Sequence, residues 1–279
     1  MRRIAGLVAA VTSLMVGASA VAADLPTKKE PPAPLVAPAI PSTWQFEITG
    51  YAWASSVAGS TGYAALPETQ YYASFLTLLQ HLQGALSGTI IARNDAFIFG
   101  LDALWSRIGG GGTIRKVDTA LYGGQADLTL NEGFVTAFGG VKIPLAMPNL
   151  DLYGTAGLRY FVSGTKLSVS GPFGIGTSTS VNKDWLMPVA GLTAQYRFDD
   201  RWFMNVLADI GGWENSATGQ ALASIGYKWT PHIATTLGYR VMYTYDKQDT
   251  GISLISFEPR SFRYQQWMYG PFAGLKYMF

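Results

Sequence analysis

Apolar side chains alternate with small or polar ones along most of the chain after Trp44, and this two-residue period constrains the fold more than any other feature. Successive side chains of a β-strand point to opposite faces, so the period predicts strands that have one apolar face and one polar face. The segment 233–246 shows it clearly, with Leu237 and Tyr239 on one face and Arg240 on the other. The final segment, 267–279, has the same form and ends on an aromatic residue.

The connections between these segments alternate between short and long. We expect short turns at 94–95, 144–149, 199–200 and 230–231, and long loops at 55–83, 109–125, 165–183, 214–219 and 247–260. This pattern predicts an all-β, transmembrane, antiparallel up-and-down β-barrel of ten strands, an even number that places both ends on the short-turn side. The segments 86–93 and 132–142 are the weakest strands, and an eight-stranded barrel follows if either pair of strands is loop instead.

The composition agrees with a membrane barrel. The chain is 48% hydrophobic and only 14% charged, well below the roughly 25% charged residues of ordinary soluble domains. It has no run of about 18 apolar residues after its N-terminal segment, so the apolar surface must be accommodated by something other than a helical span. The absence of Cys excludes disulfides, thiolate metal sites and a lipoprotein anchor. The net charge of +2 includes Arg2 and Arg3, and the near-neutral remainder argues against a nucleic-acid partner.

The residue composition divides the chain into three parts. Residues 1–23 resemble a cleaved secretory signal peptide, with a basic start, an apolar core and a small-residue cleavage site before Asp24. Residues 24–43 contain six prolines and predict an extended periplasmic linker. This linker is either a tether that touches peptidoglycan or a lipid headgroup, or a plain spacer. The barrel is expected over 44–279.

One segment, 73–83, departs from the β pattern. Its apolar residues recur at helical spacing, and Ser74 is available as an N-cap. We predict a short helix in the first extracellular loop that acts as a lid at the barrel mouth, lies on the outer surface, or has no function of its own. The residues on its apolar face are Phe75, Leu78, Leu79 and Leu82.

Charged residues fall on the polar face of many predicted strands, and inside a narrow barrel they must find partners. We expect a middle group of Asp102, Arg159, Asp209 and Arg240, and a group near the short turns of Glu47, Arg93, Arg197, Lys228 and Lys276. Arg159 and Arg240 are expected to face Asp102 or Asp209, and Lys276 to pair with Glu47. These charges either hold the lumen closed or line a narrow pore, which the excess of cations near the turns would make unfavourable to cations.

The sequence offers little support for catalysis. His81 lies in the predicted loop helix and His232 follows a turn at the opposite end, so the two cannot share a catalytic or metal centre. We predict no enzyme activity, no cofactor and no metal site. The acidic residues of the last loop do not have the spacing of a calcium-binding loop. Two alternatives stay open: a hydrolase at the barrel rim that uses His81, and a secreted soluble β-barrel that binds a ligand with its apolar face inside.

Several segments carry a resemblance to a known group of proteins. They are the start at 23–29, the proline-rich spacer, the loop segment 73–83, Gly-aromatic strands such as the one at Gly238, and the end at 277–279. With these features the chain resembles the small outer-membrane β-barrel proteins of alphaproteobacteria. The resemblance implies an outer-membrane location, a role in envelope integrity and passage of small solutes, and it supplies no catalytic residues. We also expect contact with outer-membrane lipid and lipopolysaccharide, and recognition of the last strand by the barrel-assembly machinery through Leu275, Tyr277 and Phe279.

Overall fold

The computed structural model describes residues 44–63, 69–113, 125–170, 176–252 and 259–279. The predicted signal peptide at 1–23 and the whole of the predicted linker at 24–43 lie outside the described residues. Among the described residues, no helix is both long enough and apolar enough to cross a membrane.

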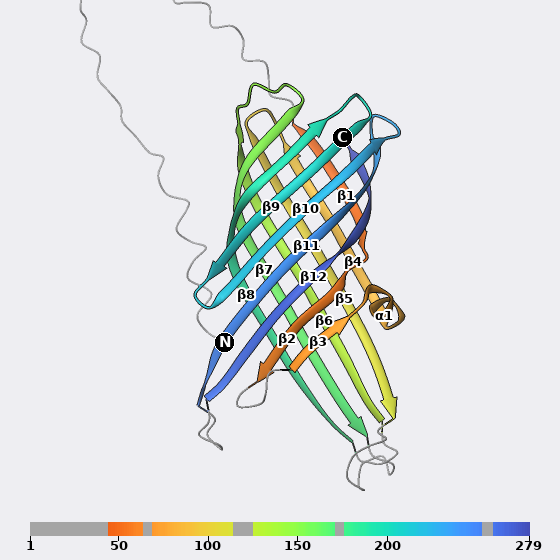
Figure 1. Cartoon of the computed structure of the whole chain (residues 1–279), viewed down its shortest axis with the longest axis vertical. Coiled ribbons are helices and arrows are strands. Elements are labelled where there is room, and N and C mark those ends of the chain that lie inside the picture. The colour runs from red at the N-terminus through yellow and green to blue at the C-terminus, as the bar shows by residue number, and fades with distance from the viewer. Residues whose placement is uncertain (1–43, 64–68, 114–124, 171–175, 253–258) are drawn as a thin grey trace, which may run out of the picture. The chain divides into compact units, whose positions relative to one another are not determined.

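The described chain forms one antiparallel sheet that closes on itself (Figure 1). Strands β4 to β12 pair in sequence order, β1 pairs with β4, and β12 pairs back with β1. The closed ring therefore has ten strands, which confirms the predicted barrel and rules out the eight-stranded alternative. The ring strands are β1 (Gln45–Trp53), β4 (Leu82–Arg93), β5 (Phe97–Thr113), β6 (Gln125–Ile143), β7 (Leu150–Ser170), β8 (Gly176–Arg197), β9 (Trp202–Trp213), β10 (Ser216–Lys228), β11 (Ile233–Ile252) and β12 (Pro259–Met278).

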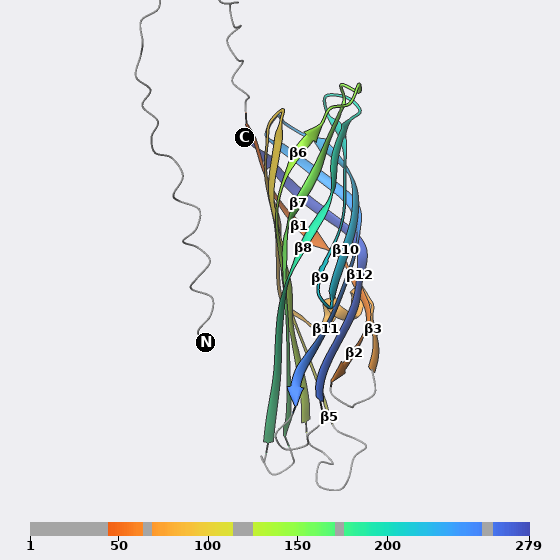
Figure 2. The same cartoon turned by 90° about the vertical axis from the view of Figure 1, so that its left-hand side faces the viewer.

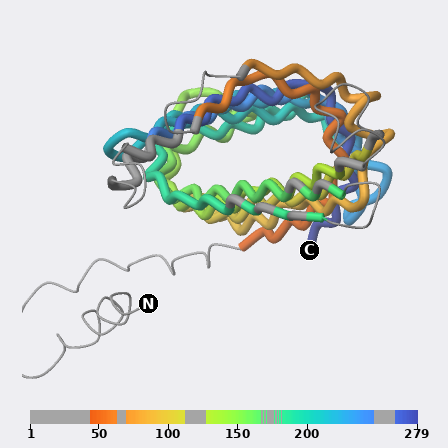
Figure 3. The backbone as a smooth tube through the Cα atoms, turned by 90° about the horizontal axis from the view of Figure 1, so that it is seen from below, coloured from red at the N-terminus to blue at the C-terminus, as the bar shows by residue number. Residues whose placement is uncertain are grey.

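The two faces of the strands separate as the alternation predicts. Figure 3 looks along the barrel, where the backbone forms an oval ring, and Figure 2 shows the strands inclined to the long axis. Large apolar side chains such as Leu86, Ile210 and Leu237 are exposed on the outside. Charged side chains such as Arg159 and Arg240 are almost fully buried inside. The barrel is thus apolar outside and polar in its middle, the reverse of a soluble protein.

The short connections are tight turns stabilised by polar side chains. The side-chain oxygen of Asn94 accepts hydrogen bonds from the backbone N–H groups of Ala96 (2.9 Å) and Phe97 (2.7 Å). The Asp199 carboxylate accepts from the backbone N–H groups of Arg201 and Trp202 in the same way, and these bonds lower the pKa of Asp199. Asn and Asp favour such turns because their side chains bond the backbone two residues further on.

The connections at the opposite end are shorter than expected. The described parts of the predicted loops at 109–125 and 165–183 are strand, since β5 reaches Thr113 and β7 reaches Ser170; residues 114–124 and 171–175 lie outside the described residues. The long loop predicted at 214–219 is wrong: β9 and β10 are joined by a two-residue turn in which Glu214 has a φ of 52°. The segment was read as loop because Thr218 and its neighbours are small and polar, but small polar residues are what the lumen-facing side of a strand carries here.

The predicted first loop, 55–83, also contains regular structure. A hairpin of β2 (Ser56–Tyr63) and β3 (Thr69–Ala73) is followed by α1 (Phe75–Gln80). Ser74 is the N-cap of α1, and its side chain accepts a hydrogen bond from Thr77 N–H at 3.3 Å. Leu82 is not on the helix as expected, because the helix ends at His81 and Leu82 begins β4. The strand β2 continues in the direction of β1 and pairs with the part of β12 that precedes the part paired with β1.

Candidate functional site

A layer of paired polar side chains crosses the lumen at mid-height. We call it the central layer; it consists of Tyr51, Asp102, Arg159, Asp209, Gln220 and Arg240. These residues come from six different strands, and each occupies a position of the inward-facing alternation. The layer is therefore built by closure of the barrel and not by any local motif.

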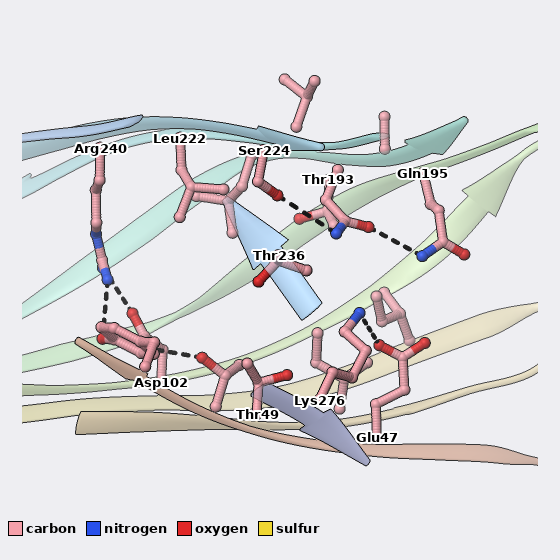
Figure 4. Close-up of a pocket in the computed structure, with 18 of the residues that line it drawn as sticks. Glu47, Thr49, Asp102, Thr193, Gln195, Leu222, Ser224, Thr236, Arg240 and Lys276 are labelled. Carbon is pink, nitrogen blue, oxygen red and sulfur yellow. Dashed lines mark hydrogen bonds and ion pairs between the residues drawn. The ribbon is translucent and has the colours of Figure 1, made fainter. Parts of the chain in front are cut away.

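Arg240 makes the first ion pair of the central layer, with Asp102 (Figure 4). Its guanidinium donates to Asp102 at 2.6 Å, to the Tyr51 hydroxyl at 3.0 Å and to the Gln220 carbonyl. The Tyr51 hydroxyl in turn donates to Asp102 at 2.8 Å. The rings of Trp53 and Phe134 lie 5.1 and 4.9 Å from the Arg240 guanidinium carbon, which places aromatic faces against the cation.

Arg159 makes the second ion pair of the layer. It is fully buried and donates to both oxygens of Asp209, at 2.9 and 2.8 Å. Its other nitrogens donate to the hydroxyls of Thr136 and Thr218, each at 2.9 Å. The Gln220 amide then donates to Asp209 at 2.5 Å and so joins the two ion pairs. Two arginines are balanced by two carboxylates, which is the condition under which buried charges are tolerated.

A second group of paired charges crosses the lumen nearer the short turns. This turn-side layer consists of Glu47, Arg93 and Lys276. Glu47 is only 3% exposed, accepts from Lys276 Nζ at 2.5 Å, and forms a second ion pair with Arg93. Lys276 Nζ also lies 5.1 Å from the centre of the Phe203 ring. Because Glu47 is on β1 and Lys276 on β12, this ion pair joins the two strands whose pairing closes the barrel.

Two of the predicted lumen charges have other surroundings. Arg197 was expected to join Glu47, but it pairs with Asp151, which also binds Lys142 at 2.6 Å. This third cluster lies at the turn-side rim, where Arg197 is 37% exposed. Lys228 faces inward and is half-buried, but it forms no ion pair among the described residues.

A small cavity separates the central layer from the turn-side layer. It measures about 130 Å³ and is the pocket drawn in Figure 4. Asp102 and Arg240 bound it on one side, and Glu47 and Lys276 bound it on the other. The rest of its lining combines polar side chains such as Thr49 and Gln195 with apolar ones such as Ile98 and Phe138. It is large enough for a few water molecules.

An apolar cluster occupies the lumen on the long-loop side of the central layer. Rings of Phe161 and Trp185 stack at 5.0 Å, and the rings of Trp185 and Tyr264 lie 5.5 Å apart. The other members are Phe134, Met187, Met242 and Met268. This lining was not expected, because the sequence reading treated the whole inward face as polar.

The histidines are far from these layers and already bonded. His81 is exposed at the end of α1, with its Nδ1 2.8 Å from the carbonyl oxygen of Thr77. His232 lies at the opposite, short-turn end, with its Nδ1 2.9 Å from the Met278 carbonyl oxygen. Within the described ranges, no three His, Cys, Asp or Glu side chains are grouped closely enough to hold a metal ion. Neither histidine adjoins the paired side chains of the lumen.

The residues assigned to membrane insertion and to the loop helix lie on the outer surface. Leu275, Tyr277 and Phe279 are 61%, 46% and 63% exposed, and Phe279 N–H donates to the Phe46 carbonyl at 3.0 Å. Phe75 and Leu78 are on α1 with Leu79, and Leu82 follows in β4. None of the residues of α1 is buried.

Sequence reasoning missed three members of the polar network. Tyr51 was placed on the polar face but not linked to the charges. Gln220 was overlooked because the strand was started too late, after the loop wrongly assigned to 214–219. Asp151 was placed opposite the apolar face of its strand, yet it was not counted as a lumen charge. All three could have been identified by extending the two-residue alternation along the full length of each strand, because it places each of them on the inward face.

The arrangement can hold the lumen shut but has no feature of a catalytic centre. Every carboxylate of the two layers already has a cation and hydrogen-bond donors around it. No such group is left as a free base or nucleophile in these layers, which a hydrolytic site would require.

Comparison with known proteins adds the following. No protein-family model matches the chain. No curated protein matches it either. Among solved structures, it is similar to Ail of Yersinia pestis at 14% identity, over 85% of this chain and 99% of that one, with a TM-score of 0.33. It is similar to the translocator domain of the autotransporter NalP of Neisseria meningitidis at 12% identity, over 85% and 89% of the two chains, with a TM-score of 0.41. The N-terminal β-barrel domain of Pseudomonas aeruginosa OprF shows 10% identity, over 84% and 97%, with a TM-score of 0.32.

Proposed function

We propose that this chain is a non-enzymatic outer-membrane β-barrel protein whose role is structural, and whose lumen is closed to ions. The observation that carries the proposal is the pairing of the apolar outer wall with the two polar layers inside. The apolar outer wall does not suit a soluble carrier, and the polar layers do not suit an open channel.

The outer wall supports the membrane location. Monomeric soluble proteins rarely expose apolar patches above a few hundred Å², whereas this barrel exposes large apolar side chains on nearly every strand. Aromatic residues such as Trp44, Trp202 and Phe279 lie near the turn-side ends, and Trp105, Trp213 and Trp267 lie further along toward the long loops. Two aromatic girdles around an apolar band are typical of outer-membrane barrels. The band would contact outer-membrane lipid and, in the outer leaflet, lipopolysaccharide.

The soluble alternative is not supported by these faces. A secreted ligand-binding barrel was expected to carry its apolar face inside. Here Leu158, Leu186 and Leu192 are all about half exposed on the outside, while the lumen at the same height holds Arg159 and Asp209. The outward leucines thus favour the membrane barrel over that alternative.

The two polar layers support a closed lumen. An ion that crossed the barrel would have to separate the Arg240–Asp102 and Arg159–Asp209 pairs, and then the Lys276–Glu47 pair. Breaking a buried pair costs several kcal/mol. A structural barrel gains from the Arg240–Asp102 and Arg159–Asp209 pairs because each joins two strands that are not neighbours in the sheet.

Planar-bilayer recording of the purified protein tests this closure. We expect no conductance steps above baseline for the wild-type protein. A variant in which all three pairs, Asp102–Arg240, Arg159–Asp209 and Glu47–Lys276, are replaced by alanine should conduct, because both layers lose their buried ion pairs while the wall remains. Conductance steps from the wild-type protein would contradict the proposal and favour a narrow pore for small solutes.

The last strand supplies a test of membrane assembly. Deletion of Phe279 removes an exposed aromatic side chain and the backbone bond from its N–H to Phe46. We expect less protein in the outer-membrane fraction and less of the compact form that shifts on heating in a gel, consistent with recognition of this strand by the barrel-assembly machinery. The control is Phe198→Ala, which removes an outward aromatic at the same end of the barrel but within the chain. Equal membrane yield of the deletion and the wild type would count against this role.

A further inference from the structure

The barrel wall is incomplete between β1 and β4. The two strands pair from Gln45 with Arg93 to Gly50 with Gly88, although β4 extends beyond this to Leu82. Past Gly50 the first strand leaves β4 and follows β12 into β2, while β3 folds back along β2. In the described part of the chain, the 82–87 edge of β4 therefore has no ladder partner on this side. We call this place the seam; α1 lies beside it (Figure 1).

A cavity of about 820 Å³ passes through the seam. Its lining includes lumen-facing residues such as Trp53, Phe134 and Phe161. It also includes outward-facing residues such as Leu86 and Trp105, which are exposed on the outer wall. A single cavity can touch both faces of a barrel wall only where the wall is open. The apolar cluster of the lumen thus communicates sideways with the outer surface.

The lining is mostly apolar, and several of its polar groups are already bonded. The Glu132 carboxylate accepts from the Tyr264 hydroxyl and the Gln266 amide, each at 3.1 Å. The Ser87 hydroxyl donates to the Tyr51 carbonyl. At the base of the cavity, Trp53 and Phe134 lie over the Arg240 guanidinium and shield that charge. These groups leave the cavity with little to offer a polar ligand, and its volume is within the roughly 300–1,000 Å³ of small-molecule sites.

The mouth of the seam opens within the apolar band of the outer wall. Leu86 is 75% exposed there and pairs with Trp105 of the girdle on the long-loop side. Leu79 of α1 also lines the mouth. Backbone that lacks ladder partners is tolerated at membrane depth only where it is covered or lines a cavity. In the proposed orientation, the groups that surround this mouth are the hydrocarbon chains of the outer leaflet.

We propose that the seam cavity binds an acyl chain, which enters sideways from the outer leaflet between β1 and β4. The inference goes beyond the structural role proposed above, because it assigns the barrel a ligand. The chain would lie against Leu86 and Trp105 at the mouth and against Phe134 and Phe161 inside. The central layer would stop it from passing further toward the short-turn end. In this arrangement α1 forms one side of the mouth, which gives the loop helix a role.

Tryptophan quenching by brominated acyl chains tests the proposal, because Trp53 faces the lumen and lines the cavity. The full chain with Trp53 as its only tryptophan, the others replaced by phenylalanine, is reconstituted in vesicles of phosphatidylcholine brominated at mid-chain. We expect Trp53 to lose most of its emission relative to unbrominated vesicles. A variant that keeps only Trp185, which is buried in the lumen behind Phe161 and does not itself line the cavity, should lose less emission than the Trp53 variant.

A matched pair of substitutions on β4 separates entry through the seam from quenching through the wall. Ala85 is exposed and lines the cavity, so Ala85→Phe should fill the mouth and restore Trp53 emission. Ala92 lies on the opposite face of the same strand, next to Phe46, so Ala92→Phe should leave the quenching unchanged. Quenching of Trp53 no greater than that of Trp185, or unaffected by Ala85→Phe, would overturn the proposal.

A second arm distinguishes the sources of the acyl chain. Brominated free fatty acid is added to vesicles of unbrominated phosphatidylcholine. Quenching in this arm alone identifies a free amphiphile as the occupant, and quenching by the brominated lipid identifies a membrane lipid. Both results support an acyl-chain site.

Native mass spectrometry provides a readout that does not depend on the tryptophan replacements. The otherwise wild-type full chain, released from detergent, should retain adducts with the mass of an acyl lipid or fatty acid. The Ala85→Phe variant should lose them and the Ala92→Phe variant should keep them, with folding of each checked by the heat-dependent gel shift. An adduct with the mass of a second copy or of another protein, or no adduct at all, would contradict the proposal.

Discussion

Replacing Arg240 with alanine should lower the free energy of unfolding by about 3–5 kcal/mol, the cost of leaving a buried charge without its partner. Asp102 would keep the hydrogen bonds from Tyr51 and Thr89 but lose its cation. Gln220 would lose the donors that hold its carbonyl. The measurement is equilibrium unfolding in urea of the protein folded into lipid vesicles, followed by the gel shift of the folded form.

Two further variants calibrate this result. Arg201→Ala removes an arginine that is exposed at a short turn, so it should change stability little. Asp102→Ala combined with Arg240→Ala removes both members of the pair and should recover part of the loss, because no lone charge is left. A loss below about 1 kcal/mol for Arg240→Ala would mean that water reaches this depth, and it would argue for a water-filled pore.

Replacing Glu47 with alanine should cost a similar amount, about 3–5 kcal/mol, because it leaves Lys276 and Arg93 without their shared carboxylate. Lys276 is buried, so its ammonium cannot reach bulk water without moving the last strand. The same urea measurement applies. A second substitution, Lys276→Met in the Glu47→Ala background, should recover much of the loss.

The turn-side rim provides the comparison for Glu47. Asp151→Ala also deprives two cations of a carboxylate, but Lys142 and Arg197 are considerably more exposed than Lys276. Water can solvate them, so we expect a smaller effect. An equal loss of stability for Asp151→Ala and Glu47→Ala would show that burial does not set the cost.

The strand faces could be predicted from the sequence because they depend on a period of two and on nothing distant. Lys276 and Glu47 were both assigned to the inward face in this way, and the structure places their side chains 2.5 Å apart. Ten strands followed from counting alternate short and long connections. These features are local, so the sequence of each strand predicts them without reference to the other strands.

The partners of individual charges could not all be predicted, because barrel strands are inclined to the axis. Equal distance from a turn along two strands does not give equal height, so Arg197 was grouped with Glu47. In the sheet, Gln195 pairs with Asp151, which brings Arg197 to that carboxylate instead. Cross-strand neighbours depend on register and inclination, which the two-residue period leaves open.

The seam was also beyond sequence reasoning. Residues 55–83 were read as one loop because glycine, serine and threonine dominate the part that forms β2. Those small residues fit beside β12, where Gly59 lies so close to the Gln265 carbonyl that an added Cβ would come within 2.2 Å of it. The local sequence pattern does not indicate that the first strand stops pairing with β4 after Gly50 and continues beside β12 alone.

The ion pair between Glu47 and Lys276 has a consequence for how the protein is made. Its members are 229 residues apart and lie on the first and last strands of the ring, so Lys276 cannot reach the Glu47 carboxylate until the ring is complete. A closure displaced by one residue would turn Lys276 toward lipid, and a strand missing from the ring would leave both charges in an open wall. The pair therefore makes incorrect closures energetically unfavourable, and the finished barrel is selected by charge neutrality as well as by hydrogen bonding.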